Sequence, residues 1–264
     1  MTIIEALILG IIQGLTEFLP VSSSGHIELG AYFLHVQSTD NLLFSIIVHG
    51  ATALSTIVVF RADILVLIKD LLKFQWNEST KFVFKIIISM IPVAIVGIGF
   101  EDHVETLFTG KILLVAGMLA FTGGLLLLTY FSGTKEKQVS FGRAFVIGMA
   151  QAIAIFPGIS RSGSTIATGL LLGVNKSEAA RFSFLMVLPP ILGATLLKAK
   201  EYFEAPELAT SVDGLPLFIG FIAAFISGLL ACQWMINIVK RGKLIYFAIY
   251  CFVVSGTVII LALL

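Results

Sequence analysis

The sequence predicts an all-α, polytopic membrane protein. Of its 264 residues, 58% are hydrophobic and only 12% are charged, whereas soluble domains carry about a quarter charged residues. The mean hydropathy is +1.02, so most of the surface is expected to face hydrocarbon rather than water. Apolar stretches long enough to cross a bilayer recur along the whole chain. Residues 1–264 are therefore expected to form a single integral membrane domain.

Six of these stretches are continuous and two are interrupted. The continuous ones fall at about 42–60, 82–100, 111–131, 182–198, 215–238 and 244–264. Two further stretches, 3–34 and 144–174, contain polar residues near their middles. The N-terminus lacks the basic region and the small-residue cleavage site of a signal peptide, so we expect it to be retained. Cys232 and Cys251 lie inside apolar stretches and are expected to be packing residues.

The two interrupted stretches resemble each other. At an offset of 137–138 residues, matching pairs are Gly10 with Gly148, Gln13 with Gln151, Phe18 with Phe156, Pro20 with Pro157, and Phe44-Ser45 with Phe182-Ser183. Further along, Gly110-Lys111 matches Gly242-Lys243 at an offset of 132. Ordered matches across both halves indicate an internal duplication, with repeat one at about 1–132 and repeat two at about 140–264.

Loop charge predicts how the spans are oriented. Basic residues dominate the connections 61–81, 132–143, 175–181 and 239–243, whereas 101–110 and 199–214 are acidic. If the basic connections are cytoplasmic, the alternation works only when each interrupted stretch turns back as a re-entrant helical hairpin. Each half then has one hairpin plus three transmembrane helices, and because three is odd the halves have opposite orientations. This inverted repeat places both termini outside and allows the hairpin tips to meet near the midplane.

The second hairpin tip carries a pattern that suits an anion. Pro157-Gly158 ends one helix, and the segment 160–165, Ser-Arg-Ser-Gly-Ser-Thr, opens the next. Free N–H groups at a helix start and an arginine fork both match phosphate oxygens. Ser160, Ser162 and Thr165 add hydroxyl donors. The alternative is a helix-capping cluster with Arg161 reaching the membrane surface, but the motif lies too centrally in its stretch for that.

The first hairpin tip carries potentially reactive groups. Gln13 and Glu17 lie four residues apart, on one helical face. Glu17 could bind a divalent cation or act as a general base, and His26 could shuttle protons or attack phosphorus. Candidate nucleophiles or hydrogen-bond donors are Ser22, Ser23 and Ser24. A buried pair between Glu17 and an arginine that locks the hairpins together is the alternative, and it is compatible with either function.

One further histidine lies inside a predicted span. His49 falls within 42–60, away from both polar interruptions. We expect it to satisfy itself by a hydrogen bond between helices rather than to take part in chemistry.

At these residues the sequence resembles the undecaprenyl-diphosphate phosphatase family, also called the bacitracin-resistance protein family. The resemblance rests on residues 13–26, Gln-Gly-Leu-Thr-Glu-Phe-Leu-Pro-Val-Ser-Ser-Ser-Gly-His, and on residues 157–165, Pro-Gly-Ile-Ser-Arg-Ser-Gly-Ser-Thr. Chain length, span count and motif spacing agree, so it covers essentially the whole chain. It implies a hydrolase of the bacterial plasma (inner) membrane that converts undecaprenyl diphosphate to undecaprenyl phosphate and phosphate. This activity recycles the lipid carrier for peptidoglycan and cell-wall synthesis and confers bacitracin resistance.

The resemblance also implies roles for particular residues. The expected catalytic residues are Glu17, Ser23, His26 and Arg161, with Ser23 as the nucleophile and His26 as the other candidate. Expected substrate contacts are Gln13, Ser22, Ser24, Ser160, Ser162 and Thr165. A divalent cation, Mg²⁺ or Ca²⁺, is expected at Glu17. Because Gln13 stands where many members of the family carry a second acid, Glu17 is left to contact the metal or act as base alone.

The alternative function is a transporter or flippase for an anionic lipid phosphate. Inverted repeats with broken helices also build secondary transporters, but anion transport does not need the group formed by Glu17, Ser23 and His26. The expected partners are the polyprenyl diphosphate and membrane lipid. A net charge of +1 gives no electrostatic basis for binding nucleic acid. A homodimer is compatible with the sequence, which does not fix an oligomeric state.

Overall fold

The computed structural model describes residues 1–34, 38–99, 111–133, 136–204 and 214–263. These residues form helices and no strand, with an isolated bridge between Lys137 and Val174, which confirms the predicted all-α class. The helices of the first half are α1 (Ile3–Phe18), α2 (Ser23–Phe33), α3 (Ser38–Val59), α4 (Arg61–Leu71), α5 (Glu78–Gly99) and α7 (Ile112–Tyr130). Those of the second half are α8 (Phe141–Ile153), α9 (Arg161–Leu171), α10 (Lys176–Met186), α11 (Leu188–Glu204), α12 (Gly214–Arg241) and α13 (Ile245–Leu263).

The helices that could cross a membrane agree with the expected spans. Five described segments are long and apolar enough: Glu78–Gly97, Ile112–Tyr130, Lys176–Leu197, Gly214–Arg241 and Ile245–Leu263. A sixth candidate is the pair α3 and α4, which is bent by 76° at its break. Each predicted continuous stretch therefore overlaps a helix of the structure, and the chain is an all-α membrane protein.

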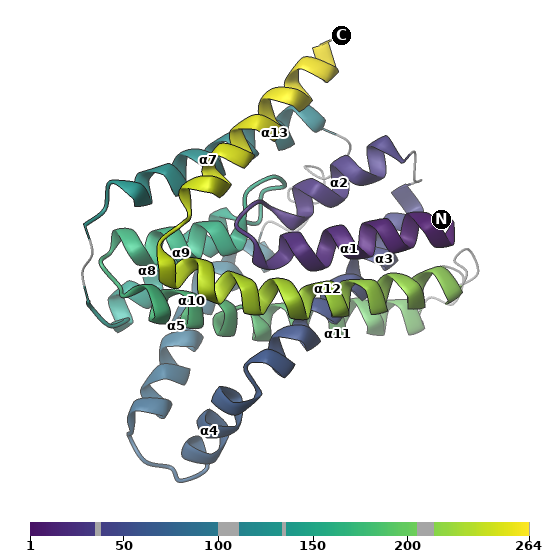
Figure 1. Ribbon diagram of the computed structural model, residues 1–264. Helices are drawn as coiled ribbons and strands as arrows, with labels where there is room; N and C mark the ends of the chain where they lie inside the picture. The colour runs from purple at the N-terminus through teal and green to yellow at the C-terminus, as the bar shows by residue number, and fades with distance from the viewer. Residues whose placement is uncertain (35–37, 100–110, 134–135, 205–213, 264) are drawn as a thin grey trace.

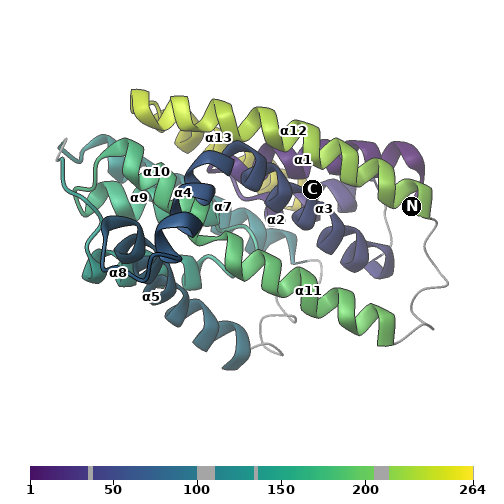
Figure 2. The same ribbon diagram turned by 90° about the horizontal axis from the view of Figure 1, so that it is seen from below.

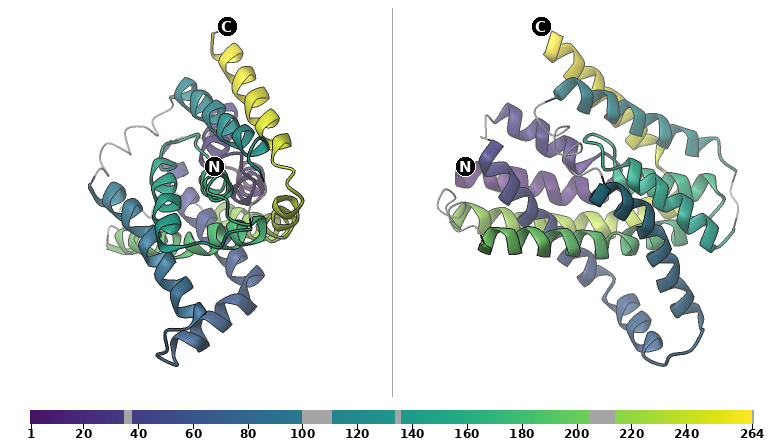
Figure 3. Two further views of the ribbon diagram at one scale, coloured as in Figure 1. Left: turned by 90° about the vertical axis from the view of Figure 1, so that its left-hand side faces the viewer. Right: turned by 180° about the vertical axis from the view of Figure 1, so that it is seen from behind.

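Part of the connection predicted at 61–81 is instead a helix. α4 forms because its apolar residues recur at helical spacing, and Leu67 is buried against the main core. Figures 1 and 3 show α4 and the adjoining end of α5, in blue, projecting from the rest of the bundle. The expectation of a loop is therefore wrong over Arg61–Leu71.

Each interrupted stretch forms two helices that pack against each other, α1 with α2 and α8 with α9. The turns of both hairpins meet near the centre of the molecule in Figure 1. They approach so closely that a Cβ on Gly25 would lie 3.1 Å from the Cα of Gly158. Ser162 Oγ also donates a hydrogen bond to the Leu19 carbonyl at 3.2 Å. The predicted meeting of the hairpin tips is confirmed.

The first helix of each hairpin packs along a helix of the other half, α1 along α12 and α8 along α5, as Figure 2 shows. A Cβ on Gly10 would lie 2.5 Å from the Gly220 carbonyl oxygen, and one on Gly148 would lie 2.2 Å from that of Ser89. Gly10 and Gly148 are matched residues of the predicted duplication. The two halves therefore hold each other through equivalent close contacts.

The last helices of the halves, α7 and α13, are antiparallel. Ser255 Oγ donates to the Ala116 carbonyl at 2.7 Å, whereas a Cβ on Gly123 would lie 3.1 Å from the Ala248 carbonyl oxygen. An inverted repeat requires this arrangement. The orientation of the halves across the membrane, and the repeat limits 1–132 and 140–264, stay predictions.

The largest apolar cluster joins both halves and fixes α10. Phe182 packs edge-to-face on Phe82 of α5, with ring centroids 5.6 Å apart, and Phe184 packs on Phe18 of α1 at 5.8 Å. Such aromatic pairs add about 0.5–1.5 kcal/mol beyond burial. α10 is thereby held against the tip of the first hairpin, where Ser183 and Phe184 face the candidate site.

Candidate active site

The two hairpins begin their second helices in the same way. Ser22 and Ser160 are the N-caps of α2 and α9, and each hydroxyl accepts a hydrogen bond from the N–H group three residues later, at 3.2 and 3.0 Å. These caps satisfy N–H groups that a helix start leaves without partners. The first helical residues are then Ser23 and Arg161, and the side chains of both reach Glu17.

Both turns use backbone in the left-handed region. Ser22 has φ 69° and Gly158 has φ 93°. Gly158 is required on two grounds, because a Cβ there would also lie 2.5 Å from the Val115 carbonyl oxygen. A non-glycine residue at positive φ costs roughly 1–3 kcal/mol and such strain clusters at functional sites. At Ser22 the strained turn aims the next residue, Ser23, back toward α1.

Glu17 is the centre of the network at the hairpin tips. Its side chain is 4% exposed. Oε2 accepts hydrogen bonds from Gln13 Nε2 at 2.9 Å and from Ser23 Oγ at 2.6 Å, while Oε1 pairs with Arg161 Nη2. Burying an ionised carboxylate costs several kcal/mol unless it is paired and hydrogen-bonded. The alternative considered from the sequence, a buried pair between Glu17 and an arginine, is present as the pair with Arg161. Ser23 also donates its hydroxyl to Glu17, so the carboxylate is placed to accept the serine proton.

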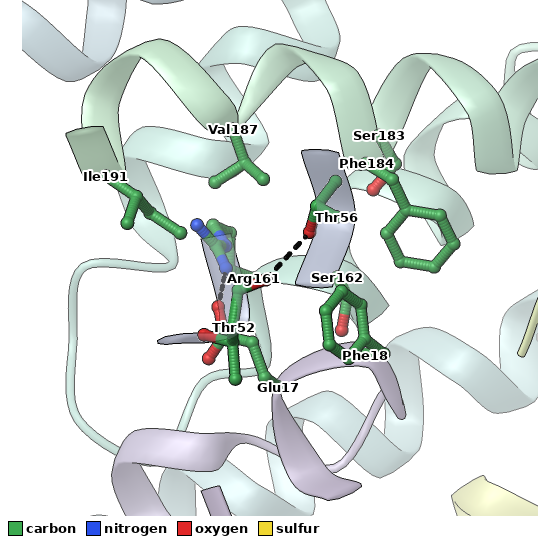
Figure 4. A pocket seen from close by; sticks show the side chains of 10 residues that line it. All are labelled: Glu17, Phe18, Thr52, Thr56, Arg161, Ser162, Ser183, Phe184, Val187 and Ile191. Carbon is green, nitrogen blue, oxygen red and sulfur yellow. Dashed lines mark hydrogen bonds and ion pairs between the residues drawn. The ribbon is translucent and has the colours of Figure 1, made fainter. Parts of the chain in front are cut away.

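Glu17 and Arg161 face a small cavity (Figure 4), which is lined by Glu17, Phe18, Thr52, Thr56, Arg161, Ser162, Ser183, Phe184, Val187 and Ile191. Its volume is ≈ 10 Å³, room for about one water molecule. One wall carries the hydroxyls of α3, and the opposite wall carries apolar side chains at the α10–α11 junction and on α11. A polar wall facing an apolar wall suits the head of an amphiphile.

The expected substrate contacts divide into two groups. Gln13 and Ser162 lie at the site, one bonded to Glu17 and the other lining the cavity. The remaining four hold the tips in shape. Ser22 and Ser160 are caps, Ser24 Oγ lies 3.3 Å from Ser22 Oγ, and Thr165 Oγ1 lies 2.6 Å from Ser183 Oγ.

His26 is the expected catalytic residue that the structure does not bring to Glu17. Its Nδ1 lies 2.8 Å from the Ser22 carbonyl oxygen, and its Nε2 lies 2.8 Å from the Tyr250 hydroxyl on α13. The two rings are stacked, with centroids 5.6 Å apart. Both ring nitrogens are thus occupied by partners outside the Glu17–Arg161 pair.

His49 lies at the site, although its sequence position predicted no role there. Its Nδ1 is 2.7 Å from the Ser45 carbonyl oxygen within α3, and its Nε2 is 3.8 Å from Glu17 Oε2. The expected hydrogen bond between helices is therefore wrong, because the partner lies one turn back on the same helix. A signal was present in the sequence: His49, Thr52 and Thr56 form a polar stripe on one face of an otherwise apolar span.

The residues around Glu17 offer a limited set of oxygen ligands for a cation. The buried Oε1 of Gln13 has no hydrogen-bond partner, and it belongs to the amide whose Nε2 donates to Glu17. In the described part of the chain, no group of three His, Cys, Asp or Glu residues could hold a metal ion. Mg²⁺ is commonly held by one or two carboxylates together with substrate phosphates and waters. The donor set fits a cation shared with a phosphate ligand rather than one enclosed by protein.

Comparisons with known proteins agree over nearly the whole chain. The family model for bacitracin resistance protein BacA matches residues 6–257. An undecaprenyl-diphosphatase from Bacteroides thetaiotaomicron is 52% identical over 261 residues, covering 98% of this chain and 99% of its own. Those from Parabacteroides distasonis and Christiangramia forsetii are 54% and 55% identical, covering 97% and 99% of this chain and 96% and 99% of their own.

Proposed function

The chain belongs to the bacitracin resistance protein BacA family, and we propose that its Glu17–Ser23–Arg161 site hydrolyses undecaprenyl diphosphate to undecaprenyl phosphate and inorganic phosphate. The protein is accordingly a membrane phosphatase that recycles the lipid carrier of cell-wall synthesis and gives resistance to bacitracin. One observation carries the assignment of the site. A serine hydroxyl at a helix start lies 2.6 Å from a carboxylate that is itself paired with an arginine from the opposite hairpin.

Ser23 is the nucleophile in this proposal. Its Oγ attacks the terminal phosphorus, an Oγ–P bond forms, and the bond from phosphorus to the bridging oxygen breaks. Glu17 takes the hydroxyl proton, and the electron pair leaves with undecaprenyl phosphate. Ser23 is preferred to His26 because its side chain contacts the base, whereas the nitrogens of His26 contact Ser22 and Tyr250.

Arg161 and the start of α9 hold the phosphoryl group that is transferred. The guanidinium has five N–H donors, and one nitrogen pairs with Glu17, so further donors remain for phosphate oxygens. The helix start adds a partial positive charge. Fixed donors aimed at developing negative charge commonly supply the largest share of catalysis.

Water completes the reaction. Its oxygen attacks the phosphorus on Ser23, the Oγ–P bond breaks, and Ser23 recovers a proton from Glu17 while inorganic phosphate leaves. Atoms balance over the two steps: one water is consumed, and one anhydride bond is broken. The carboxylate thus acts as base in the first step, and its proton returns to the serine in the second.

We also propose that Glu17 and the free carbonyl oxygen of Gln13 hold Mg²⁺ or Ca²⁺ together with the diphosphate. The cation, when bound, neutralises charge on the phosphate oxygens. Gln13 contributes no charge, so Glu17 supplies the protein's carboxylate contact by itself.

Access to the site requires the cavity walls to separate. Room for about one water molecule is far too little for a diphosphate. We expect α3 and α11 to move apart, with the head group against the threonines of α3 and the prenyl chain along the apolar side of α11. The protein works as a multi-pass protein of the bacterial plasma membrane. Glu17, Ser23 and Arg161 come from one chain, so the chemistry needs no second copy, although a homodimer is compatible with it.

The test is release of phosphate from undecaprenyl diphosphate by purified protein in detergent. Glu17→Gln removes the base, and Arg161→Ala removes the guanidinium that binds the phosphoryl group. Each should lower kcat by at least about 100-fold. Glu78→Gln, at an exposed carboxylate paired with Lys81, is the matched control and should be unaffected. A chelator should abolish release by the wild type, and added Mg²⁺ or Ca²⁺ should restore it.

Two results would overturn the proposal. One is wild-type release by Glu17→Gln or Arg161→Ala. The other is no release by the wild type together with flux of a lipid phosphate into liposomes, which would instead indicate a transporter.

A further inference from the structure

The His49 side chain lies beside the Glu17 carboxylate, with Nε2 3.8 Å from Oε2. It lies on α3 in the same polar stripe as Thr52 and Thr56, which line the cavity. The His49 side chain is 30% exposed, whereas that of Glu17 is 4% exposed. A small molecule that approaches Glu17 from this side therefore meets His49 as well.

The contact within α3 fixes which nitrogen carries hydrogen. His49 Nδ1 lies 2.7 Å from the Ser45 carbonyl oxygen, and a carbonyl oxygen can only accept. Nδ1 is therefore the N–H nitrogen, and in the neutral ring Nε2 is left as an acceptor. That acceptor points toward Glu17 Oε2, which is an acceptor too.

Two acceptors side by side make a seat for a water molecule. The 3.8 Å between Nε2 and Oε2 is too long for a direct hydrogen bond, but one oxygen atom can lie about 2.8 Å from both. A water in that seat donates one hydrogen to His49 and the other to Glu17. Its lone pairs then point away from both acceptors, so the oxygen is oriented as a nucleophile.

We propose that His49 is a further residue of the reaction, which with Glu17 positions the water that hydrolyses phosphorylated Ser23. This inference rests on the proposed function. Ser23 and the seat share Glu17 Oε2, so a water held there lies beside the phosphoryl group that Ser23 carries. In the step, the water oxygen forms a bond to phosphorus and the Oγ–P bond breaks. Glu17 returns to Ser23 Oγ the proton that it took in the first step, receives one water proton in exchange, and gives that proton up to the departing inorganic phosphate. His49 keeps its own proton throughout and acts by orienting the water.

Three substitutions separate this role from packing. Asparagine places its amide near the position of Nδ1, so His49→Asn keeps the bond to Ser45 and loses the group that faces Glu17. Glutamine reaches the position of Nε2 with a carbonyl acceptor, so His49→Gln keeps the acceptor that holds the water. His49→Ala removes both.

The experiment measures kcat, KM and trapped phosphoenzyme for the four full-length proteins in detergent. Substrate labelled in its terminal phosphate is mixed with enzyme and quenched in acid. We expect His49→Asn and His49→Ala to lose roughly 10- to 100-fold in kcat with little change in KM, and to accumulate more labelled Ser23 than the wild type does. We expect His49→Gln to restore kcat to within about threefold of the wild type. Thermal unfolding should show that His49→Asn is folded.

Wild-type kcat in His49→Asn would overturn the inference. So would a loss of kcat that glutamine does not rescue and that leaves no extra phosphoenzyme, because that pattern indicates packing alone. Failure of the proposed function gives a different result, since the wild type itself would then release no phosphate.

Discussion

Glu17 receives hydrogen bonds from three different helices: from Gln13 of α1, Ser23 of α2 and Arg161 of α9. The carboxylate is buried, so each partner both satisfies it and fixes its direction. Removing Arg161 would leave an uncompensated buried charge, which costs about 3–5 kcal/mol in other proteins. The stability of the fold and the proposed catalysis are therefore coupled at Glu17, and activity assays on variants need a folding control.

Neighbouring serines at the first tip should differ sharply in importance. We expect Ser23→Ala to lower kcat at least about a thousandfold, because the proposed nucleophile is lost, and to abolish the acid-stable phosphoenzyme. Ser24→Ala should remain within a few-fold of the wild type, because the hydroxyl lies 3.3 Å from Ser22 Oγ rather than at Glu17. Phosphate release and acid-quench trapping measure both. Because phosphohistidine is labile in acid and stable in alkali, a phosphoenzyme that survives only an alkaline quench, persists in Ser23→Ala and is absent from His26→Ala would assign the nucleophile to His26 instead.

The sequence could identify some of these residues and not others. Glu17 and Arg161 stand out because ionisable groups in apolar stretches are costly and rare. The sequence could not show which of Ser22, Ser23 and Ser24 points toward Glu17. Successive side chains on a helix point about 100° apart, so the answer depends on the residue at which α2 begins, and the sequence does not fix that residue. His49 escaped notice because its partner Glu17 lies on another helix, 32 positions earlier in the chain.

The helix pairs that carry the hairpins are held by close glycine contacts. α8 meets α5 at Gly148, and α1 meets α12 at Gly10 and Gly14. In a membrane, helices gain little from the hydrophobic effect and associate through such small-residue packing. The hairpins must keep their depth for the tips to meet, so these contacts support the site from a distance.

Two glycines of α8 provide a matched test. A Cβ on Gly148 would lie 2.2 Å from the backbone carbonyl oxygen of Ser89, whereas one on Gly142 would meet nothing within 4 Å. We expect Gly148→Ala to destabilise the protein by about 1–3 kcal/mol, because a backbone atom cannot yield as a flexible side chain can. Gly142→Ala should be neutral or stabilising by up to about 1 kcal/mol, because alanine favours a helix. Thermal unfolding midpoints in detergent measure both. Equal midpoints would show that α8 does not depend on this contact.

At the scale of elements, the sequence predicted the hairpins and missed a bend. Matched glycines and prolines predicted two similar interrupted helices, but they could not show that each glycine packs on the other half. The break between α3 and α4 lacks a proline or glycine: Val59, Phe60 and Arg61 are all compatible with a continued helix. The 76° bend depends on tertiary packing, which places Phe60 and Leu67 in the main core.

In the whole molecule, the two halves interlock rather than sit side by side. α1 of the first half packs along α12 of the second, α8 of the second packs along α5 of the first, and the tips share one ion pair. Neither half therefore contains a complete site. The predicted duplication of one half would account for the matching helix starts at Ser22 and Ser160, and divergence after it would account for Ser23 on one side and Arg161 on the other.

Opposite orientation of the halves can be tested at one pair of matched residues. Lys111 directly precedes α7 and Lys243 lies just before α13, and both are exposed. Because α7 and α13 are antiparallel, their starts lie at opposite ends of the pair. The inverted repeat thus predicts that Lys111 lies outside and Lys243 in the cytoplasm, although the sequence around them is alike.

In a background of Cys232→Ala and Cys251→Ala, a membrane-impermeant maleimide should label Lys111→Cys on intact cells. Lys243→Cys should be labelled only after permeabilisation. Labelling of both from the same side would rule out the inverted arrangement, and with it the explanation of why two similar hairpins point their tips at each other.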